Sequence, residues 1–167
     1  NLSVSVVVPH KRVIEKENTG SLFTRRVCLE ASKGDYIYIM DADDSLIDKD
    51  MLKKVKDTLQ NSNCDMVFFN CTTDMESKLS HYEYPFSEGE VFAGEDLKKI
   101  YDLVLEGSTF NILWNKVFKR TLVDWDEDYS EYGHVTNGTD AFQMIPILSN
   151  AKRIVYMSDV FYFYRTQ

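Results

Sequence analysis

Short hydrophobic runs alternate with amphipathic segments through the first half of the chain. Hydrophobic residues in Val4–Val8, Tyr36–Met40 and Asp65–Asn70 predict strands. The consecutive apolar residues of Tyr36–Met40 predict that this strand is buried on both faces. Hydrophobic residues at helical spacing predict helices over 21–32 and 48–61. Strands that alternate with helices indicate an α/β fold, with a mainly parallel sheet flanked by helices.

The second half of the chain has a less regular pattern. The elements predicted there are an amphipathic helix over 92–106, a helix that follows Asp140, and two strands over 153–157 and 160–164. Pro146 falls inside the second of these helices and is expected to bend or interrupt it. Residues 111–119 mix aromatic and basic side chains and predict no defined element. The total of 167 residues fits a single domain with a core of its own.

The beginning of the chain lacks one connection that this fold requires. The strand that ends at Pro9 is followed almost directly by Lys11, and a short apolar pair, Val13-Ile14, is the next candidate strand. Parallel neighbouring strands need a crossover, and a complete strand–helix–strand unit takes roughly 30 residues or more. We therefore expect that a segment is missing between His10 and Lys11.

Charge and composition narrow the classes of partner. A net charge of −8 and a pI near 4.9 argue against nucleic acid, because nucleic acids are bound by clustered basic residues. Acidity does not exclude a phosphorylated ligand, since a bound metal ion supplies positive charge locally. The sequence contains no signal peptide and no run that approaches the roughly 18 apolar residues of a membrane span. Three cysteines without a Cys-x-x-Cys pair predict reduced thiols and a cytoplasmic protein.

Three acids follow the second predicted strand directly. Asp41, Asp43 and Asp44 come after Tyr36–Met40, so they lie at the carboxyl edge of the predicted sheet, where open α/β folds bind their ligands. Carboxylates packed this closely repel one another. A divalent cation removes that repulsion, and Mg²⁺ is commonly held by one or two carboxylates together with substrate phosphates. The loop therefore predicts a metal ion that carries a phosphorylated ligand, although an acid such as Asp44 also suits a helix cap.

Several short motifs occur in a characteristic order along the chain. They are Glu17-Asn18-Thr19-Gly20, Arg25-Arg26, Ala31-Ser32-Lys33-Gly34-Asp35-Tyr36-Ile37, Asp41-Ala42-Asp43-Asp44, Gly138-Thr139-Asp140 and the closing Tyr162-Phe163-Tyr164-Arg165. Together with an opening strand that ends in Pro9, they resemble the family 2 glycosyltransferases, which are inverting, nucleotide-sugar-dependent enzymes with the GT-A fold. The resemblance implies one Rossmann-like GT-A domain over 1–167, with a nucleotide-sugar-binding half (1–75) and an acceptor-side half (76–167).

The same resemblance implies which residues perform the chemistry. Asp43 is expected to be the main ligand of Mg²⁺ or Mn²⁺, with Asp41 reaching the metal or the ribose and Asp44 supporting both. Asp140 is expected to be the general base that takes the proton of the acceptor hydroxyl. Read from spacing alone, Asp140 is equally an acid stabilised by the dipole of a helix N-terminus.

Other residues are expected to shape the two substrate sites. Arg25 suits the donor phosphates, because a guanidinium binds phosphate oxygens in pairs. Asn18 and Gly20 are expected to form a tight loop beside the donor, and Pro9 to close the strand below it. Residues 114–116 (Trp-Asn-Lys) are candidates for the border of the acceptor site, with Trp114 better explained as core.

The resemblance also implies a function. We expect a metal-dependent inverting glycosyltransferase that moves a sugar from a nucleotide-sugar, by family habit a UDP-sugar, to a glycan or lipid-linked acceptor in surface polysaccharide synthesis. Such an enzyme would work in the cytoplasm, at the inner face of the cell membrane, in peripheral contact with it. The sequence predicts neither the oligomeric state nor the sugar.

Three departures from the family pattern leave alternatives open. The acidic turn that binds the nucleotide base is missing, Arg26 replaces an asparagine, and Thr139 replaces a glutamate. One alternative is a phosphatase resembling the haloacid dehalogenases, with Asp41 as nucleophile and Asp43 as acid and base. The other is a degenerate transferase fold that acts as a binding module without catalysis.

Overall fold

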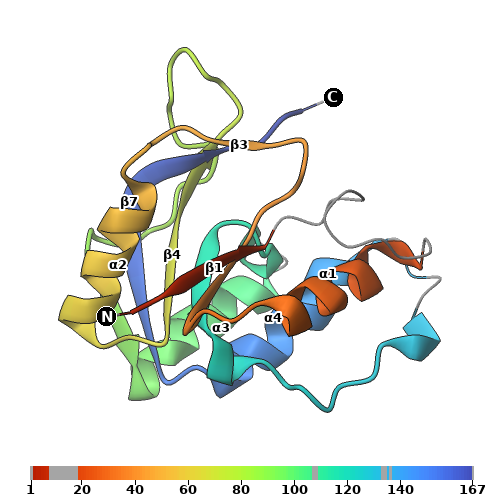
Figure 1. Ribbon diagram of the computed structural model, residues 1–167. Coiled ribbons are helices and arrows are strands. Elements are labelled where there is room, and N and C mark those ends of the chain that lie inside the picture. Colours follow the sequence, from red (N-terminus) through yellow and green to blue (C-terminus); the bar gives the residue numbers. More distant parts are fainter. Residues whose placement is uncertain (1, 8–18, 107–108, 133–134, 136, 167) are drawn as a thin grey trace.

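A seven-stranded mixed sheet forms the centre of the molecule (Figure 1). The computed structural model describes residues 2–7, 19–106, 109–132, 135 and 137–166. The strands are β1 (Val4–Val7), β2 (Tyr36–Ile39), β3 (Ser45–Leu46), β4 (Met66–Thr72), β5 (Val91–Ala93), β6 (Lys116–Lys119) and β7 (Arg153–Phe163). Their order is β1-β2-β6-β4-β7-β3, and β5 pairs with β7 outside this path. The three strands predicted in the first half are thereby confirmed.

The sheet is less parallel than the alternation of elements predicted. Strand β1 is parallel to β2 and β4 is parallel to β7, whereas the pairs β2–β6, β6–β4, β7–β3 and β5–β7 are antiparallel. The difference arises from β6, which lies between β2 and β4 and lies within residues 111–119, for which no element was predicted. Lysines at both of its ends gave this buried strand the appearance of a polar segment.

The last two predicted strands form one strand. Residues 153–157 and 160–164 were predicted separately, because Ser158-Asp159 is a polar pair that suggests a turn. Instead, β7 continues through this pair, and its register against β4 shifts between Phe68 and Asn70 and again before Cys71. The side-chain amide of Asn70 donates a hydrogen bond to the Ser158 carbonyl (2.9 Å), so this backbone oxygen has a partner where the strand pairing is irregular.

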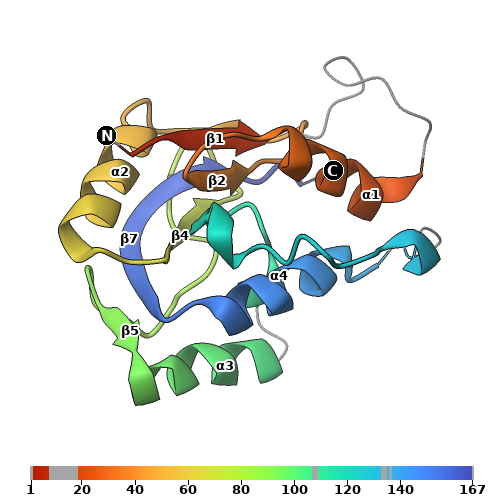
Figure 2. The ribbon, with the colours of Figure 1, turned by 60° about the horizontal axis from the view of Figure 1, so that its bottom comes forward.

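Helices cover both faces of the sheet (Figure 2). They are α1 (Gly20–Ala31), α2 (Met51–Ser62), α3 (Leu97–Leu105) and α4 (Thr139–Asn150), with short 3₁₀ turns at 94–96, 109–111, 120–122 and 130–132. The structure confirms three of the predicted helices to within a few residues. The fourth, α3, begins later than the predicted 92–106 because 91–93 form β5. Helix α4 continues through Pro146 without interruption.

Alternating side chains along the strands divide the core into two layers. On β2, Ile37 and Ile39 pack with α1, α3 and α4, whereas Tyr36 and Tyr38 pack with α2 on the opposite face. The same two-residue period separates Met66 from Val67 on β4. Strands that are apolar on both faces are thus explained by helices on both sides, as predicted.

Gly34 allows the backbone of β1 to approach the loop before β2. Helix α1 ends before this glycine, because the residue that caps it is Ser32, in an extended conformation. Gly34 instead lies against Ser5, whose hydroxyl accepts hydrogen bonds from the amides of Lys33 (3.2 Å) and Gly34 (2.7 Å). A Cβ atom at position 34 would lie 2.4 Å from the Ser5 nitrogen.

Gly34→Ala is therefore expected to displace β1 and to lower the free energy of unfolding by about 3 kcal/mol, the upper end of the range for overpacking. Urea unfolding measures the loss, and amide hydrogen exchange shows whether Val4–Val7 exchange faster. Gly89→Ala is the comparison without a steric clash, because no heavy atom lies within 4 Å of a Cβ there. Its φ of 73° makes alanine cost about 1 kcal/mol through backbone strain alone, and exchange in β1 should stay unchanged. Unchanged exchange in β1 of Gly34→Ala would contradict this account of Gly34.

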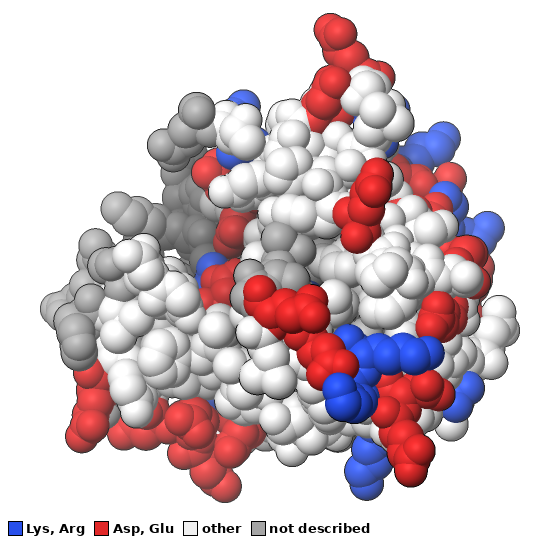
Figure 3. All heavy atoms as spheres, turned by 180° about the vertical axis from the view of Figure 1, so that it is seen from behind, with Lys and Arg blue, Asp and Glu red and all other residues white. Residues whose placement is uncertain are grey.

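Charged side chains of both signs are spread over the surface. On the face in Figure 3, acidic side chains are widely distributed and the basic ones lie among them rather than in one continuous patch, as far as the described residues cover it. No helix within the described ranges is long and apolar enough to cross a membrane. The expected join between His10 and Lys11 and the candidate strand at Val13-Ile14 lie outside the described residues.

Candidate functional site

The loop of residues 41–44, which contains Asp41, Asp43 and Asp44 and is called the acidic loop below, lies at the carboxyl edge of the two parallel strands β1 and β2. Val7 pairs with Ile39 at the ends of these strands, and Asp41 follows two residues later. The loop then leads to β3, which pairs with β7 at the other end of the sheet. The loop therefore crosses the edge at which an open α/β sheet binds its ligand.

Asp41 is a partly buried carboxylate with a cation close by. Its side chain is 31% exposed, and Oδ1 lies 3.6 Å from Nη2 of Arg25. Burial raises the pKa of Asp41 above its ordinary value, Arg25 opposes that rise, and the neighbouring acids Asp140, Asp44 and Asp43 add to it. This carboxylate is thus held where negative charge is costly, and a cation lowers that cost.

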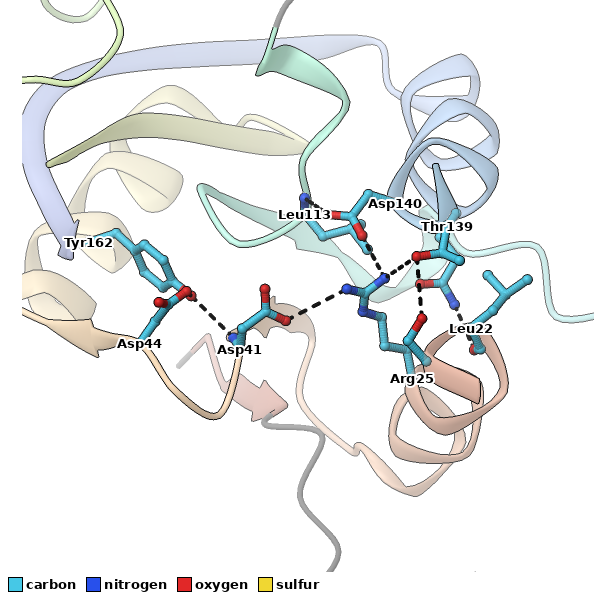
Figure 4. A network of polar contacts seen from close by, with 10 residues as sticks. Leu22, Arg25, Asp41, Asp44, Leu113, Thr139, Asp140 and Tyr162 are labelled. Carbon is cyan, nitrogen blue, oxygen red and sulfur yellow. Dashed lines mark hydrogen bonds and ion pairs between the residues drawn. The ribbon is translucent and has the colours of Figure 1, made fainter. Parts of the chain in front are cut away.

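Arg25 connects the acidic loop to the start of α4 (Figure 4). Its side chain is 8% exposed, and Nη1 lies 2.6 Å from Oδ1 of Asp140. The same nitrogen donates a hydrogen bond to Oγ1 of Thr139 (3.3 Å). One guanidinium from α1 therefore contacts two carboxylates that are 99 residues apart in the sequence.

Asp140 is held from a third direction by the loop before β6. The backbone N–H of Leu113 donates a hydrogen bond to Oδ2 of Asp140 (3.3 Å), so each of the two oxygens has a partner. Gly138 precedes the helix in the left-handed conformation, with φ of 72°. This backbone turns the chain so that Asp140 lies in the first turn of α4, where the helix dipole favours a carboxylate.

Asp44 is held by hydrogen bonds from β7 and from the segment that follows it. The hydroxyl of Tyr162 donates a hydrogen bond to Oδ2 of Asp44, and the backbone N–H of Arg165 donates one to Oδ1 (2.8 Å). The same hydroxyl accepts a hydrogen bond from the Asp41 N–H (3.2 Å). Burial raises the pKa of Tyr162, and the bond to Asp44 raises it further, so the phenol remains a donor. These contacts suit a residue that supports the loop.

Asp43 is exposed and makes no hydrogen bond or ion pair with the described residues. In the part of the chain that the structure describes, no three histidine, cysteine or acidic side chains are grouped as a ready-made metal cage. Mg²⁺ needs no such cage, because it keeps several waters and combines one or two carboxylates with substrate phosphates. A free carboxylate at the sheet edge fits that donor set, so Asp43 is the residue of the loop best placed to bind a metal.

The loop before β6 is stabilised by a buried lysine. Lys116 has no exposed surface, and its Nζ donates hydrogen bonds to the Ile112 carbonyl (2.7 Å) and to Oδ1 of Asn115 (2.6 Å). Burial lowers the pKa of Lys116 well below its ordinary value, and Asp140 opposes that shift. Trp114 is 5% exposed, as expected of a core residue. Lys116 thus holds the turn that carries the Leu113 amide, and it does not border solvent.

The structure brings together four of the site residues predicted from the sequence: Arg25, Asp41, Asp44 and Asp140. Gly20 begins α1 with φ of 86°, one residue before Ser21, whose hydroxyl contacts Thr139. Asn18 and Pro9 lie outside the described residues. The sequence prediction missed Tyr162, Thr139 and the Leu113 amide as members of the site. Tyr162 reads as one more aromatic of a buried strand, and a backbone amide leaves no signal in the sequence.

Comparisons with known proteins agree on one family. The family model described as glycosyl transferase family 2 matches residues 8–124. Glycosyltransferase GlyG of Streptococcus pneumoniae serotype 4 (strain ATCC BAA-334 / TIGR4) is 27% identical over 165 residues, which cover 92% of this chain and 52% of that protein. The chain therefore spans about half the length of this curated relative.

Solved structures of S. aureus TarS share the fold. TarS 1–349 matches with a TM-score of 0.62 and 17% identity, covering 91% of this chain and 42% of TarS 1–349. TarS 1–349 in complex with UDP-GlcNAc matches with a TM-score of 0.63 and 18% identity, covering 92% and 41%. At this identity the likeness concerns the fold, which is an α/β mixed sheet of the GT-A type with helices on both faces, as predicted.

Proposed function

The chain belongs to glycosyl transferase family 2, and from this premise we propose that it moves a sugar from a UDP-linked donor to a hydroxyl group of an acceptor glycan or lipid-linked glycan. The observation that carries the proposal is the position of Arg25 between Asp41 and Asp140. Glycosyl transfer needs positive charge near the leaving diphosphate and a base near the acceptor. The guanidinium joins the two segments that would supply these functions.

The donor diphosphate is proposed to lie over the acidic loop. Asp43 would hold Mg²⁺ or Mn²⁺, with Asp41 beside it and Asp44 keeping the loop in shape through Tyr162. When bound, the metal would neutralise charge on the leaving phosphates. Arg25 lies 3.6 Å from Asp41 and offers a second cationic group on the α1 side of the loop. UDP as the nucleotide is supported by solved TarS complexes with UDP-GlcNAc and with UDP.

Asp140 is proposed to accept the proton of the acceptor hydroxyl. Arg25 and the Leu113 amide each hold one oxygen of its carboxylate, so its orientation is fixed before any substrate binds. With the donor on the acidic loop and the base on α4, the acceptor would attack from the face opposite the leaving group, which inverts the anomeric centre. Surface polysaccharide synthesis at the inner face of the membrane is the corresponding proposal for the pathway.

Calorimetric titration of UDP tests the donor site. We expect roughly micromolar binding that requires Mn²⁺, and Asp43→Ala is expected to weaken it at least about tenfold, or about 1.4 kcal/mol. Asp57→Ala is the matched control, since it removes an exposed carboxylate from α2, away from the loop. Equal binding by both variants would exclude Asp43 as the metal ligand.

Two assays distinguish the alternatives left open by the sequence, which are a phosphatase and a binding module without catalysis. Release of inorganic phosphate from phosphate monoesters by a chain that does not bind UDP would favour the phosphatase. A chain that binds UDP with Mn²⁺ but neither hydrolyses UDP-GlcNAc nor transfers its sugar to any carbohydrate would favour the binding module.

A further inference from the structure

Three aromatic rings form a stacked column beside the acidic loop. Trp114 stacks on Tyr162, with ring centroids 4.5 Å apart and planes inclined by 10°, and on Tyr164, at 5.5 Å and 9°. Tyr162 and Tyr164 are two residues apart on an extended chain, so their side chains point to the same face. The three rings therefore make one rigid column, which we call the aromatic column.

The aromatic column lies between the two halves of the proposed active site. The hydroxyl of Tyr162 donates a hydrogen bond to Oδ2 of Asp44, and the backbone N–H of Arg165, the residue after Tyr164, donates one to Oδ1. Trp114 directly follows Leu113, whose amide binds Asp140. The column is thus tied through single residues to the acidic loop and to the candidate base.

Tyr164 is the one ring of the aromatic column with substantial exposure to solvent. Tyr162 is completely buried and Trp114 is 5% exposed, whereas Tyr164 is 37% exposed. The backbone of Tyr164 is anchored, because its N–H donates a hydrogen bond to the Thr72 carbonyl (2.9 Å) and so extends the ladder between β4 and β7. Tyr164 thus keeps part of its surface exposed to solvent on a fixed support.

We propose that Tyr164 is the platform on which a pyranose ring of the acceptor stacks, an inference that rests on the proposed function. The face of an aromatic ring is electron-rich, and the C–H groups on one face of a pyranose carry partial positive charge. A ring already held by Trp114 loses little conformational entropy when the sugar binds. The sugar's hydroxyl groups would remain free to form hydrogen bonds.

The topology favours the acceptor over the donor nucleotide. The parallel strands β1 and β2, with Arg25 nearby, lie at one end of the sheet order, and β7 and β3 lie at the other. The acidic loop crosses from β2 to β3 between them. A donor diphosphate on the β2 side leaves the β7 side, where Tyr164 lies, for a sugar residue of the acceptor next to the one whose hydroxyl reaches Asp140 beside Arg25.

Saturation-transfer-difference NMR on the protein loaded with UDP and Mg²⁺ tests this inference, with methyl β-glucoside, lactose and N,N′-diacetylchitobiose as probes. We expect the ring protons of at least one probe to receive saturation from the wild type and from Tyr164→Phe, and to lose most of it with Tyr164→Ala. Tyr101→Ala is the matched control, since Tyr101 is also 37% exposed but lies on α3. Saturation should be unchanged in this control.

Calorimetric titration of UDP into the same variants distinguishes a failure of the Tyr164 platform from a failure of the proposed function. Unchanged UDP binding together with lost sugar binding in Tyr164→Ala supports the platform. Equal sugar binding by wild type and Tyr164→Ala overturns it, as does the absence of binding by all three probes to a protein that binds UDP. Loss of UDP binding in Tyr164→Ala would assign the ring to the donor and also overturn it. A wild type that binds no UDP contradicts the proposed function itself.

Discussion

Asp140→Asn is expected to lower the turnover number for sugar transfer by about 10²–10⁴-fold, the usual contribution of a general base. Asparagine has nearly the same shape, and its carbonyl oxygen still accepts a hydrogen bond from Arg25, but its NH2 group replaces the oxygen that accepts from the Leu113 amide, so that one bond is lost. Asparagine does not take a proton. The loss should therefore fall on catalysis, with the fold and the affinity for UDP little changed.

The measurement is UDP release from UDP-GlcNAc in the presence of the best probe sugar, followed for the wild type and the variant at saturating donor. Asp102→Asn serves as the control, because the Asp102 side chain on α3 is 45% exposed and pairs, among the described residues, with Lys98 alone. Thermal melting and UDP titration establish that both variants are folded and loaded. A turnover number within about threefold of the wild type would remove Asp140 from the mechanism, since it corresponds to less than about 1 kcal/mol.

Arg25→Met is expected to destabilise the protein by about 3 kcal/mol, near the lower end of the range for breaking a buried ion pair. The variant leaves Asp41 and Asp140 without their shared cation, although both keep part of their surface in water, 31% and 24%. For a domain of this size, that loss corresponds to a fall in melting temperature of about 6–12 °C.

The destabilisation should depend on pH with a defined sign. Burial already raises the folded-state pKa of Asp41 above 3.8, so folding stability falls as the pH rises through the interval between the unfolded and folded pKa values. Removal of Arg25 removes the influence that opposes this rise. The variant should therefore lose more stability relative to wild type at pH 7.5 than near pH 4, because a raised pKa of Asp41 lets the folded variant take up a proton as the pH falls.

Urea unfolding of the metal-free protein at the two pH values measures this difference. Lys54→Met is the matched control, because Lys54 also bridges two carboxylates, those of Asp48 and Asp159, but it is 45% exposed. Solvent screens an exposed bridge of this kind, so this control is expected to lose much less stability than Arg25→Met. Equal losses in the two variants would mean that the Arg25 pair behaves as a surface contact.

The elements of the first half could be predicted because local pattern and tertiary burial agree there. Strands β2 and β4 are covered on both faces, so every residue in them is buried and all but Asn70 and Thr72 are apolar, which makes the pattern easy to identify. Strand β6 escaped prediction because Lys116 is buried among hydrogen-bond partners that only the folded chain supplies. The continuity of β7 through Ser158-Asp159 likewise depends on a partner, Asn70, that is distant in sequence.

The sequence predicted which charged residues belong to the site, but it did not predict the contacts between them. Acids after a buried strand and an arginine on α1 were identifiable, because the carboxyl edge of a sheet gathers such groups from separate segments. The contact of one arginine with both Asp41 and Asp140 depends on how α1 and α4 pack. Tyr162 and the Leu113 amide act through a phenol and a backbone group, which sequence patterns do not mark as functional.

The most direct test of the central claim is to locate Mn²⁺ by its anomalous scattering in crystals grown with UDP and Mn²⁺. We predict one manganese ion within coordination distance of the Asp43 carboxylate and of the UDP diphosphate, with Arg25 on the same side of the loop. Manganese bound elsewhere, or a diphosphate placed away from the loop of residues 41–44, would contradict the assignment of this sheet edge as the donor site.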